Sequence, residues 1–261
     1  MGSLTHERYC DEIIDRTDAL RAVLRGADLG TAVPTCPDWT LRDLALHVGG
    51  AHRWVGEILR TRATEAIPLE RVPDSAPGSE DPAALDAWLA EGAAKTVEAL
   101  REAGPDVEVW AWAWEPSTGF WARRMAHETI VHQADAALTA GAGYEVAPEL
   151  AADTIEEWLE IVAFVRAARR AASGEETPEL IGPGQSIHLH ATDVPDAEWL
   201  IESGEDGFGW RRAHAKASVA LRGPLTDVML AFNRRLPADS DRVEVAGDAQ
   251  VLNTWLEHTS F

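Results

Sequence analysis

The sequence predicts an α+β protein in two parts: a four-helix bundle over residues 1–147 and a smaller, mainly antiparallel α+β part over residues 148–261. In the first part, apolar residues recur at the helical period of 3.6. From residue 187, short runs alternate with a period of two, which is typical of half-buried strands. A chain of 261 residues with 46% hydrophobic composition is long enough to give each part its own core.

Four helices are expected in the first part, and residues at their ends support them. Their expected ranges are residues 5–29, 40–59, 82–103 and 118–140. Thr40 followed by Asp43 is an approximate capping box, with Asp in place of Glu. Asp81 and Pro82 form an N-cap and N1 pair that opens the third helix. Gly141 is a stop signal for the fourth helix.

Two connecting segments interrupt this helical pattern. Residues 66–82 are rich in Pro, Gly and Ser and indicate a linker or long surface loop. Residues 107–115 alternate and place Trp110, Trp112 and Trp114 on one face. Periodicity alone leaves open whether this second segment is a short strand or an extended hydrophobic loop.

The second part mixes helical and extended segments, which is typical of an α+β domain. The expected helices cover residues 149–172, 224–235 and 248–256, and the expected strands cover residues 187–191, 198–202, 215–221 and 242–246. Residues 204–207, Gly-Glu-Asp-Gly, indicate a turn between the second and third of these strands.

Charge and cysteine content exclude several classes of function. Forty-four acidic residues face 23 basic ones, a net charge of −21, which disfavours binding to nucleic acid or to an anionic membrane surface. No apolar run approaches the ~18 residues of a membrane span. Two cysteines without a CxxC pair suit a reducing compartment, and the charged first residues suit a chain without a signal peptide, so we expect a cytoplasmic protein.

The fourth expected helix carries the residues that are the strongest candidates for metal binding or catalysis. Glu128 and His132 lie one turn apart on one face, where a carboxylate and an imidazole can bind one metal ion. Asp135 and Arg124 lie on the same stripe. The alternative is an intrahelical Glu–His pair on a solvated face. His127 is five residues from His132 and points elsewhere, so this is not the HExxH motif of zinc proteases, and we expect His127 to be packed.

A metal site needs at least a third ligand, and the second helix offers His47 and His52. Periodicity does not choose between them. His188 and His190 alternate along one face of an expected strand, where they could also bind a metal, although polar histidines at a sheet edge are the commoner case.

Several longer motifs resemble those of the mycothiol-dependent maleylpyruvate isomerase family. They are Pro34-Thr-Cys-Pro-Asp-Trp-Thr-Leu-Arg-Asp-Leu-Ala-Leu-His47, Trp121-Ala-Arg-Arg-Met-Ala-His-Glu-Thr-Ile-Val-His-Gln-Ala-Asp135, and in the second part residues 219–236 and 243–248. The resemblance spans essentially the whole chain. It implies a DinB-type metal-binding four-helix bundle followed by a C-terminal α+β domain that is similar to sterol-carrier folds.

Carried over by position, the resemblance implies that His47, Glu128 and His132 bind a divalent metal. Zn²⁺ is expected first, with Ni²⁺, Co²⁺ or Fe²⁺ as alternatives for two histidines and a carboxylate. The resemblance further implies a thiol cosubstrate, mycothiol, that adds to a small electrophilic molecule. Elimination after bond rotation gives cis–trans isomerisation, and retention of the adduct gives S-transfer.

Other residues are expected to assist this metal site. Arg124 and Asp135 are candidates for catalytic roles. Arg124 could donate to an anionic substrate or thiol, or, as we slightly favour, pair with Asp135. Asp135 could orient His132 through its second ring nitrogen. Cys36 is not needed as a nucleophile and is expected to pack. Candidates for contact with the thiol or substrate are Trp54 and Trp121 in the first part and Arg222 and Arg234 in the second.

Two other functions remain open from the sequence. The chain could be a non-enzymatic carrier, with an apolar ligand in the second part and a structural metal in the bundle. It could also be a DinB-type enzyme that uses another thiol or activated water. We expect a monomer or homodimer with small-molecule partners and no nucleic-acid or membrane partner.

Overall fold

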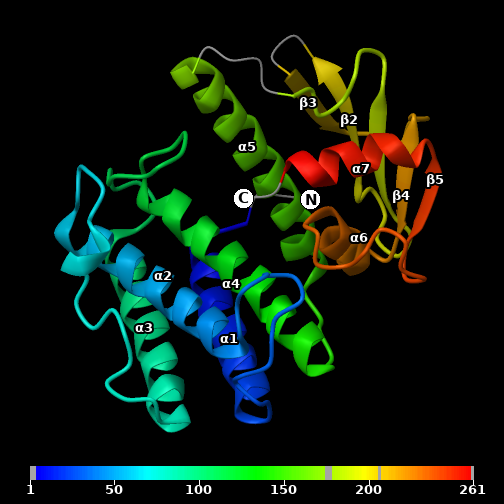
Figure 1. Cartoon of the computed structure of the whole chain (residues 1–261). Coiled ribbons are helices and arrows are strands. Elements are labelled where there is room, and N and C mark those ends of the chain that lie inside the picture. Colours follow the sequence, from blue (N-terminus) through cyan, green and yellow to red (C-terminus); the bar gives the residue numbers. More distant parts are fainter. Residues whose placement is uncertain (1–3, 174–177, 205–206, 260–261) are drawn as a thin grey trace. The chain divides into compact units, whose positions relative to one another are not determined.

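The computed structural model describes residues 4–173, 178–204 and 207–259, and these residues form two compact units (Figure 1). The division falls between Tyr144 and Glu145. The first unit is helical and the second combines helices with a five-stranded sheet, so the predicted α+β class is confirmed. Within the described ranges, no helix combines the length and apolar character that a membrane crossing requires.

The first unit contains the four predicted helices and one short 3₁₀ turn. They are α1 (His6–Arg25), α2 (Leu41–Thr61), η1 (Leu69–Arg71), α3 (Pro82–Ala103) and α4 (Thr118–Ala140). The capping box forms as predicted, because Thr40 and Asp43 each accept a hydrogen bond from the other's backbone N–H. Gly141 ends α4 with a φ of 63°, a left-handed conformation that favours glycine. The first helix ends at Arg25, earlier than predicted, because Gly26 already caps it.

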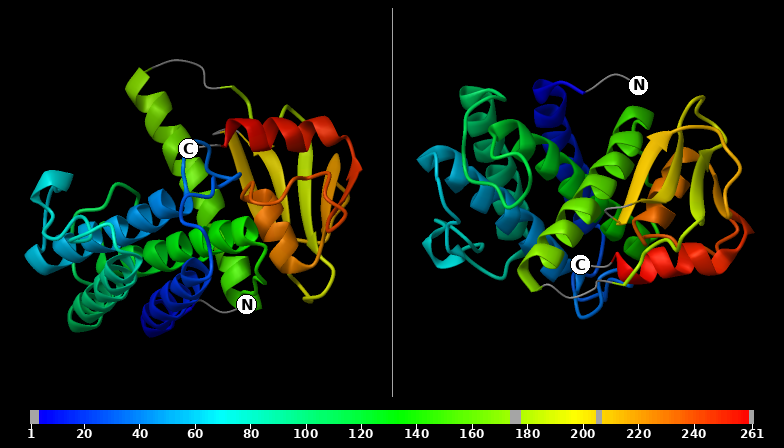
Figure 2. Two further views of the ribbon diagram at one scale, coloured as in Figure 1. Left: turned by 60° about the horizontal axis from the view of Figure 1, so that its bottom comes forward. Right: turned by 90° about the horizontal axis from the view of Figure 1, so that it is seen from above.

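Most side chains of helix α4 are buried. It packs against α1 and also contacts α2 and α3, and both views of Figure 2 show it beside α1 and α2. Five alanines of α4 are fully buried, which lets neighbouring helices approach closely: Ala122, Ala126, Ala134, Ala136 and Ala137. Several polar side chains of α4 are buried with them: Thr129, His127, Gln133 and Asp135. A helix surrounded in this way positions polar groups rigidly, because its neighbours restrict their rotamers.

The Trp-rich segment 107–115 is a loop with an isolated β-bridge near its ends, which settles the choice left open by the sequence. The ring of Trp110 packs against those of Trp54 and Trp121, at centroid distances of 5.6 and 6.2 Å. The indole N–H of Trp121 donates to the carbonyl oxygen of Trp110 over 2.7 Å. This loop therefore covers one end of the hydrophobic core.

The second unit contains three helices and one mixed sheet. Its elements are α5 (Pro148–Ser173), β1 (Ser186–Ala191), β2 (Glu198–Gly204), β3 (Gly207–Arg212), β4 (Val219–Gly223), α6 (Leu225–Phe232), β5 (Glu244–Gly247) and α7 (Ala249–His258). The strand order is β3-β2-β1-β4-β5. The pair β1–β4 is parallel and the other three pairs are antiparallel, so the sheet is mainly antiparallel as predicted.

Strand β3 was not predicted, and β4 is shorter than predicted. Gly207 and Gly209 lie in β3, and glycine weakens the sequence pattern of a strand. The middle of the expected turn at 204–207, Glu205 and Asp206, lies outside the described residues. Residues 215–218, which the alternation had assigned to a strand, form irregular chain before β4.

The two faces of the sheet differ in chemistry. Side chains on one face are fully buried and apolar, among them Ile187, Leu189, Trp199, Ile201 and Leu221. The opposite face of β1 and β2 carries His188, His190 and Glu198, because successive residues of a strand point to opposite sides.

Two adjacent glycines on α2 give a test of the bundle packing. A Cβ on Gly49 would lie 2.1 Å from a ring carbon of Trp88, whereas nothing lies within 4 Å of a Cβ on Gly50. We expect Gly49→Ala to lower the free energy of unfolding by about 1–3 kcal/mol through overpacking. We expect Gly50→Ala to raise it by up to about 1 kcal/mol, because alanine favours a helix. Urea unfolding curves measure both, and equal losses in the two variants would contradict the packing described.

Candidate metal centre

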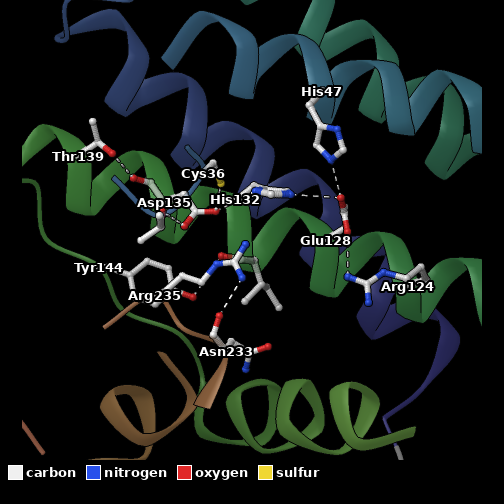
Figure 3. Close-up of polar contacts among 12 residues, drawn as sticks. Cys36, His47, Arg124, Glu128, His132, Asp135, Thr139, Tyr144, Asn233 and Arg235 are labelled. Carbon is white, nitrogen blue, oxygen red and sulfur yellow. Dashed lines mark hydrogen bonds and ion pairs between the residues drawn. The ribbon is translucent and has the colours of Figure 1, made fainter. Parts of the chain in front are cut away.

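Three side chains from α2 and α4 meet around one carboxylate oxygen (Figure 3). His47 projects from α2, and Glu128 and His132 project from successive turns of α4. The Oε1 atom of Glu128 lies 2.8 Å from Nε2 of His47 and 3.3 Å from Nε2 of His132. One potential ligand atom from each residue lies within 4.8 Å of the other two. Two imidazoles and a carboxylate at this spacing are a donor set that suits a divalent transition metal.

The other oxygen of Glu128 is held by an arginine on the same helix. Nη2 of Arg124 lies 3.0 Å from Oε2 of Glu128, one turn away. This contact fixes the carboxylate plane and leaves Oε1 directed at the two histidines. Arg124 is therefore adjacent to the candidate ligand Glu128.

His132 is oriented by a fully buried aspartate. Its Nδ1 lies 2.9 Å from Oδ2 of Asp135, so its Nε2 faces Glu128. Asp135 also accepts hydrogen bonds from segment 32–40: Thr35 Oγ1 donates over 2.5 Å and Cys36 Sγ over 3.6 Å. A carboxylate behind a histidine in this way fixes its tautomer and ring orientation. Cys36, which we expected only to pack, thus has a polar contact with Asp135.

The electrostatics of this centre favour positive charge between its two carboxylates. Burial alone would raise the pKa of Glu128, but hydrogen bonds from His132 and His47 and the charge of Arg124 hold it well below its usual value. Burial alone would lower the pKa of His132, but hydrogen bonds with Asp135 and other neighbours raise it well above its usual value. A divalent cation supplies the same compensating charge, so the residues present fit a metal ion.

Trp39 places an aromatic ring beside these ligands. Its ring centroid lies 4.7 Å from that of His47 and 6.0 Å from that of His132. Sequence reasoning did not select Trp39, although it directly precedes the N-cap of α2. The sequence predicts that Trp54 and Trp121 contact the thiol or substrate. Both rings lie in a cluster with Trp110, and their contact with a thiol stays a prediction.

The geometry separates His47 from the other histidines of the bundle. Nε2 of His52 lies 2.9 Å from Oγ1 of Thr129, and the side chain is fully buried. His127 is also fully buried, with its ring 5.9 Å from that of Tyr9. Among the described residues, neither belongs to a group of three potential metal ligands.

Two further candidates lie in the second unit. Arg222 on β4 forms an ion pair with Glu244 over 2.9 Å. Arg234 follows α6 with a φ of 63°. Their contact with a thiol or substrate stays a prediction.

Comparisons with known proteins agree with this architecture. Residues 10–137 match the family model described as the mycothiol maleylpyruvate isomerase N-terminal domain, and residues 149–254 match the MDMPI C-terminal domain. Crystal structures of the mycothiol-dependent maleylpyruvate isomerase and of its histidine-to-alanine variant share the fold, with TM-scores of 0.57 and 0.56. In both cases the identity is 14%, over 94% of this chain and 96% of the other. No curated protein matches.

Fold and site define a two-unit α+β protein whose helical bundle brings two histidines and a glutamate together. The two family models together match most of the chain. The chain belongs to the mycothiol-dependent maleylpyruvate isomerase family.

The burial of His52 predicts a pH dependence of stability. Burial lowers its pKa to about 4 from the ordinary value of 6.5. The folded state therefore keeps His52 neutral where the unfolded chain takes up a proton. Its contribution to stability is complete above pH 6.5 and is lost as the pH falls from about 6.5 to about 4. We expect His52→Gln, measured by urea unfolding, to lose less stability than the wild type across this window.

The exposed His258 on α7 provides the control for this comparison. We expect His258→Gln to follow the wild-type profile. Parallel pH profiles for His52→Gln and the wild type would show that His52 titrates normally in the folded state.

Proposed function

We propose that this protein is a metal-dependent isomerase that uses a low-molecular-weight thiol, mycothiol, as cosubstrate. The observation that carries the proposal is the convergence of His47, Glu128 and His132 on one point, with Asp135 behind His132. Membership of the family supports the choice of mycothiol and of isomerisation. A cytoplasmic location and a monomeric or homodimeric state stay predictions.

In this proposal His47, Glu128 and His132 hold the metal, with Zn²⁺ as the expected ion. Three protein ligands leave a coordination position open, which is typical of catalytic sites. When bound, a divalent ion lowers the pKa of a coordinated thiol, about 8.5 when free, and favours the thiolate. Asp135 keeps the Nδ1 proton of His132 and so directs Nε2 toward the metal position.

Neighbouring residues define the rest of the site. Arg124 holds Oε2 of Glu128 and limits the rotation of that carboxylate. The Trp39 ring lies against both histidines and provides an apolar wall that excludes water from one side of them. We assign the same positioning role to Thr35, which donates to the Asp135 carboxylate.

The reaction we propose is the cis–trans isomerisation of a double bond conjugated to a carbonyl group. The thiolate sulfur forms a bond to one alkene carbon, and the π electron pair moves to the carbonyl oxygen as an enolate. The former double bond then rotates freely. The enolate pair re-forms the double bond, the C–S bond breaks and the thiolate leaves unchanged. No oxidant or reductant is consumed, and retention of the adduct would give S-transfer.

The first test removes a ligand. We expect the purified wild type to contain a divalent metal and to isomerise maleylpyruvate only when mycothiol is present. We expect His47→Ala to lose metal and to lower kcat/KM by about 100-fold or more, since even the loss of a group that supports a ligand costs about 10–100-fold. Metal analysis and turnover assays with and without mycothiol measure these effects, and His258→Ala is the matched histidine control.

Specific results would overturn this proposal. If His47→Ala kept full metal content and full turnover, the proposed metal centre would be wrong. If turnover without a thiol, or with another thiol, equalled turnover with mycothiol, the assignment of mycothiol as cosubstrate would be wrong. Absence of turnover together with a copurified apolar ligand that Glu128→Ala still binds would favour the carrier function instead.

The second test addresses Asp135 as a positioning residue. We expect Asp135→Asn to lower metal affinity by about 10–100-fold, because the amide no longer holds His132 as a carboxylate does. Competition with a chromophoric chelator measures this affinity. Asp86→Asn, which removes a carboxylate paired with Arg21 at 2.7 Å, is the matched control and should keep wild-type affinity. Equal affinities in Asp135→Asn and Asp86→Asn would contradict the role of Asp135.

A further inference from the structure

A second group of histidines lies on the polar face of the sheet in the second unit. His188 and His190 alternate along β1, and Glu198 on β2 is the direct partner of His190 in the antiparallel register. Paired residues of adjacent strands point to the same side, so these three side chains share a face. His214 lies two residues after the end of β3 and joins them there.

All three imidazoles direct a nitrogen at the same carboxylate oxygen. Oε2 of Glu198 lies 2.7 Å from Nε2 of His188, 3.1 Å from Nδ1 of His190 and 2.7 Å from Nδ1 of His214. The ring centroids of the three histidines form a nearly equilateral triangle with sides of 5.4, 5.6 and 5.6 Å. One potential ligand atom from each of the four residues lies within 4.8 Å of every other.

Hydrogen bonding alone does not account for this convergence. A carboxylate oxygen directs two lone pairs, and here three imidazole nitrogens face the same oxygen. His188 and His214 form hydrogen bonds with this oxygen, and the nitrogen of His190 makes a third contact with it at 3.1 Å. Three imidazole nitrogens around one point, with a carboxylate oxygen among them, are instead the arrangement in which proteins hold a transition-metal ion.

The burial of the four side chains suits a site at the protein surface that ions can reach. The side chain of His188 is 7% exposed, those of Glu198 and His190 are 17% and 19% exposed, and that of His214 is 76% exposed. His188 and His190 are fixed by the strand, whereas His214 is on irregular chain and can adjust. One side of the group is thus rigid and the other is adaptable.

We propose that His188, His190, Glu198 and His214 form a second divalent metal site, with Zn²⁺ as the first ion to test. Tetrahedral zinc with bonds of about 2.0–2.1 Å places its ligand atoms roughly 3.3 Å apart. The separations of 2.7–3.1 Å to Oε2 reach this value with small side-chain rotations. Four protein ligands complete the coordination of zinc, so this is a structural site. It links β1 and β2 to the chain that follows β3.

This second site is independent of the proposed function, because it shares no residue with the centre on α2 and α4. Sequence reasoning noted His188 and His190 as a pair that could bind metal. Glu198 and His214 were not associated with them, because the strand register and the path of the chain after β3 bring them together.

The test measures zinc binding to the full chain after its metal has been removed with a chelator. The Glu128→Ala variant removes the centre on α4 and isolates the second site. We expect Glu128→Ala to bind about one zinc ion per chain. We expect the triple variant, which combines Glu128→Ala, Glu198→Gln and His214→Ala, to bind zinc at least about tenfold more weakly than Glu128→Ala does. Glu128→Ala with His258→Ala is the matched control and should bind as Glu128→Ala does.

NMR of the histidine ring nitrogens gives a second readout that leaves all four residues of the second site unchanged. Zinc should shift the ring signals of His188, His190 and His214 in Glu128→Ala. Equal zinc binding with and without the Glu198→Gln and His214→Ala changes would overturn the proposal, as would histidine signals that zinc does not move. Failure of the proposed function would instead show as a wild type that binds no more zinc than Glu128→Ala.

Discussion

The candidate centre in the bundle depends on the burial of one carboxylate, Asp135. A buried charge is costly unless hydrogen bonds and opposite charge compensate it, and here Thr35, Cys36 and His132 supply these contacts. Two consequences follow. The segment before α2 is held against α4, which places Trp39 beside the histidines. The ring of His132 is held in the orientation in which Nε2 faces Glu128.

The position of α4 explains how the bundle can hold such a group rigidly. Small residues allow close packing of α4 with its neighbours, so its polar side chains are enclosed and have few alternative rotamers. Polar side chains of α4 form hydrogen bonds with different neighbours. Thr129 and Glu128 contact His52 and His47 of α2. Asp135 contacts Thr35 in the segment that precedes α2. A single helix thus orders both the core and the site.

How much was predictable from sequence depends on whether a feature is local. The ends of α2 and α4 could be predicted because Thr40 and Gly141 act within a few residues, and the Glu128–His132 pair because helical spacing fixes it. The choice between His47 and His52 rested on resemblance, since the rotation of α2 against α4 is set by packing. Trp39 was missed for the same reason. Strand β3 was missed because its glycines obscure the alternation.

The two histidine groups differ in the number of donor side chains, which distinguishes a site suited to catalysis from one suited to a structural ion. On α2 and α4, two histidines share one glutamate oxygen, and Asp135 supports one histidine from behind. Three donors would leave one coordination position of a bound ion open for a reacting molecule. The aspartate fixes the orientation of one of these donors. On the sheet, three histidines share one glutamate oxygen. Four donors fill a tetrahedral shell, so an ion there would stabilise the unit and leave no position for a substrate. The function proposed above therefore places the thiol at the open set of three donors.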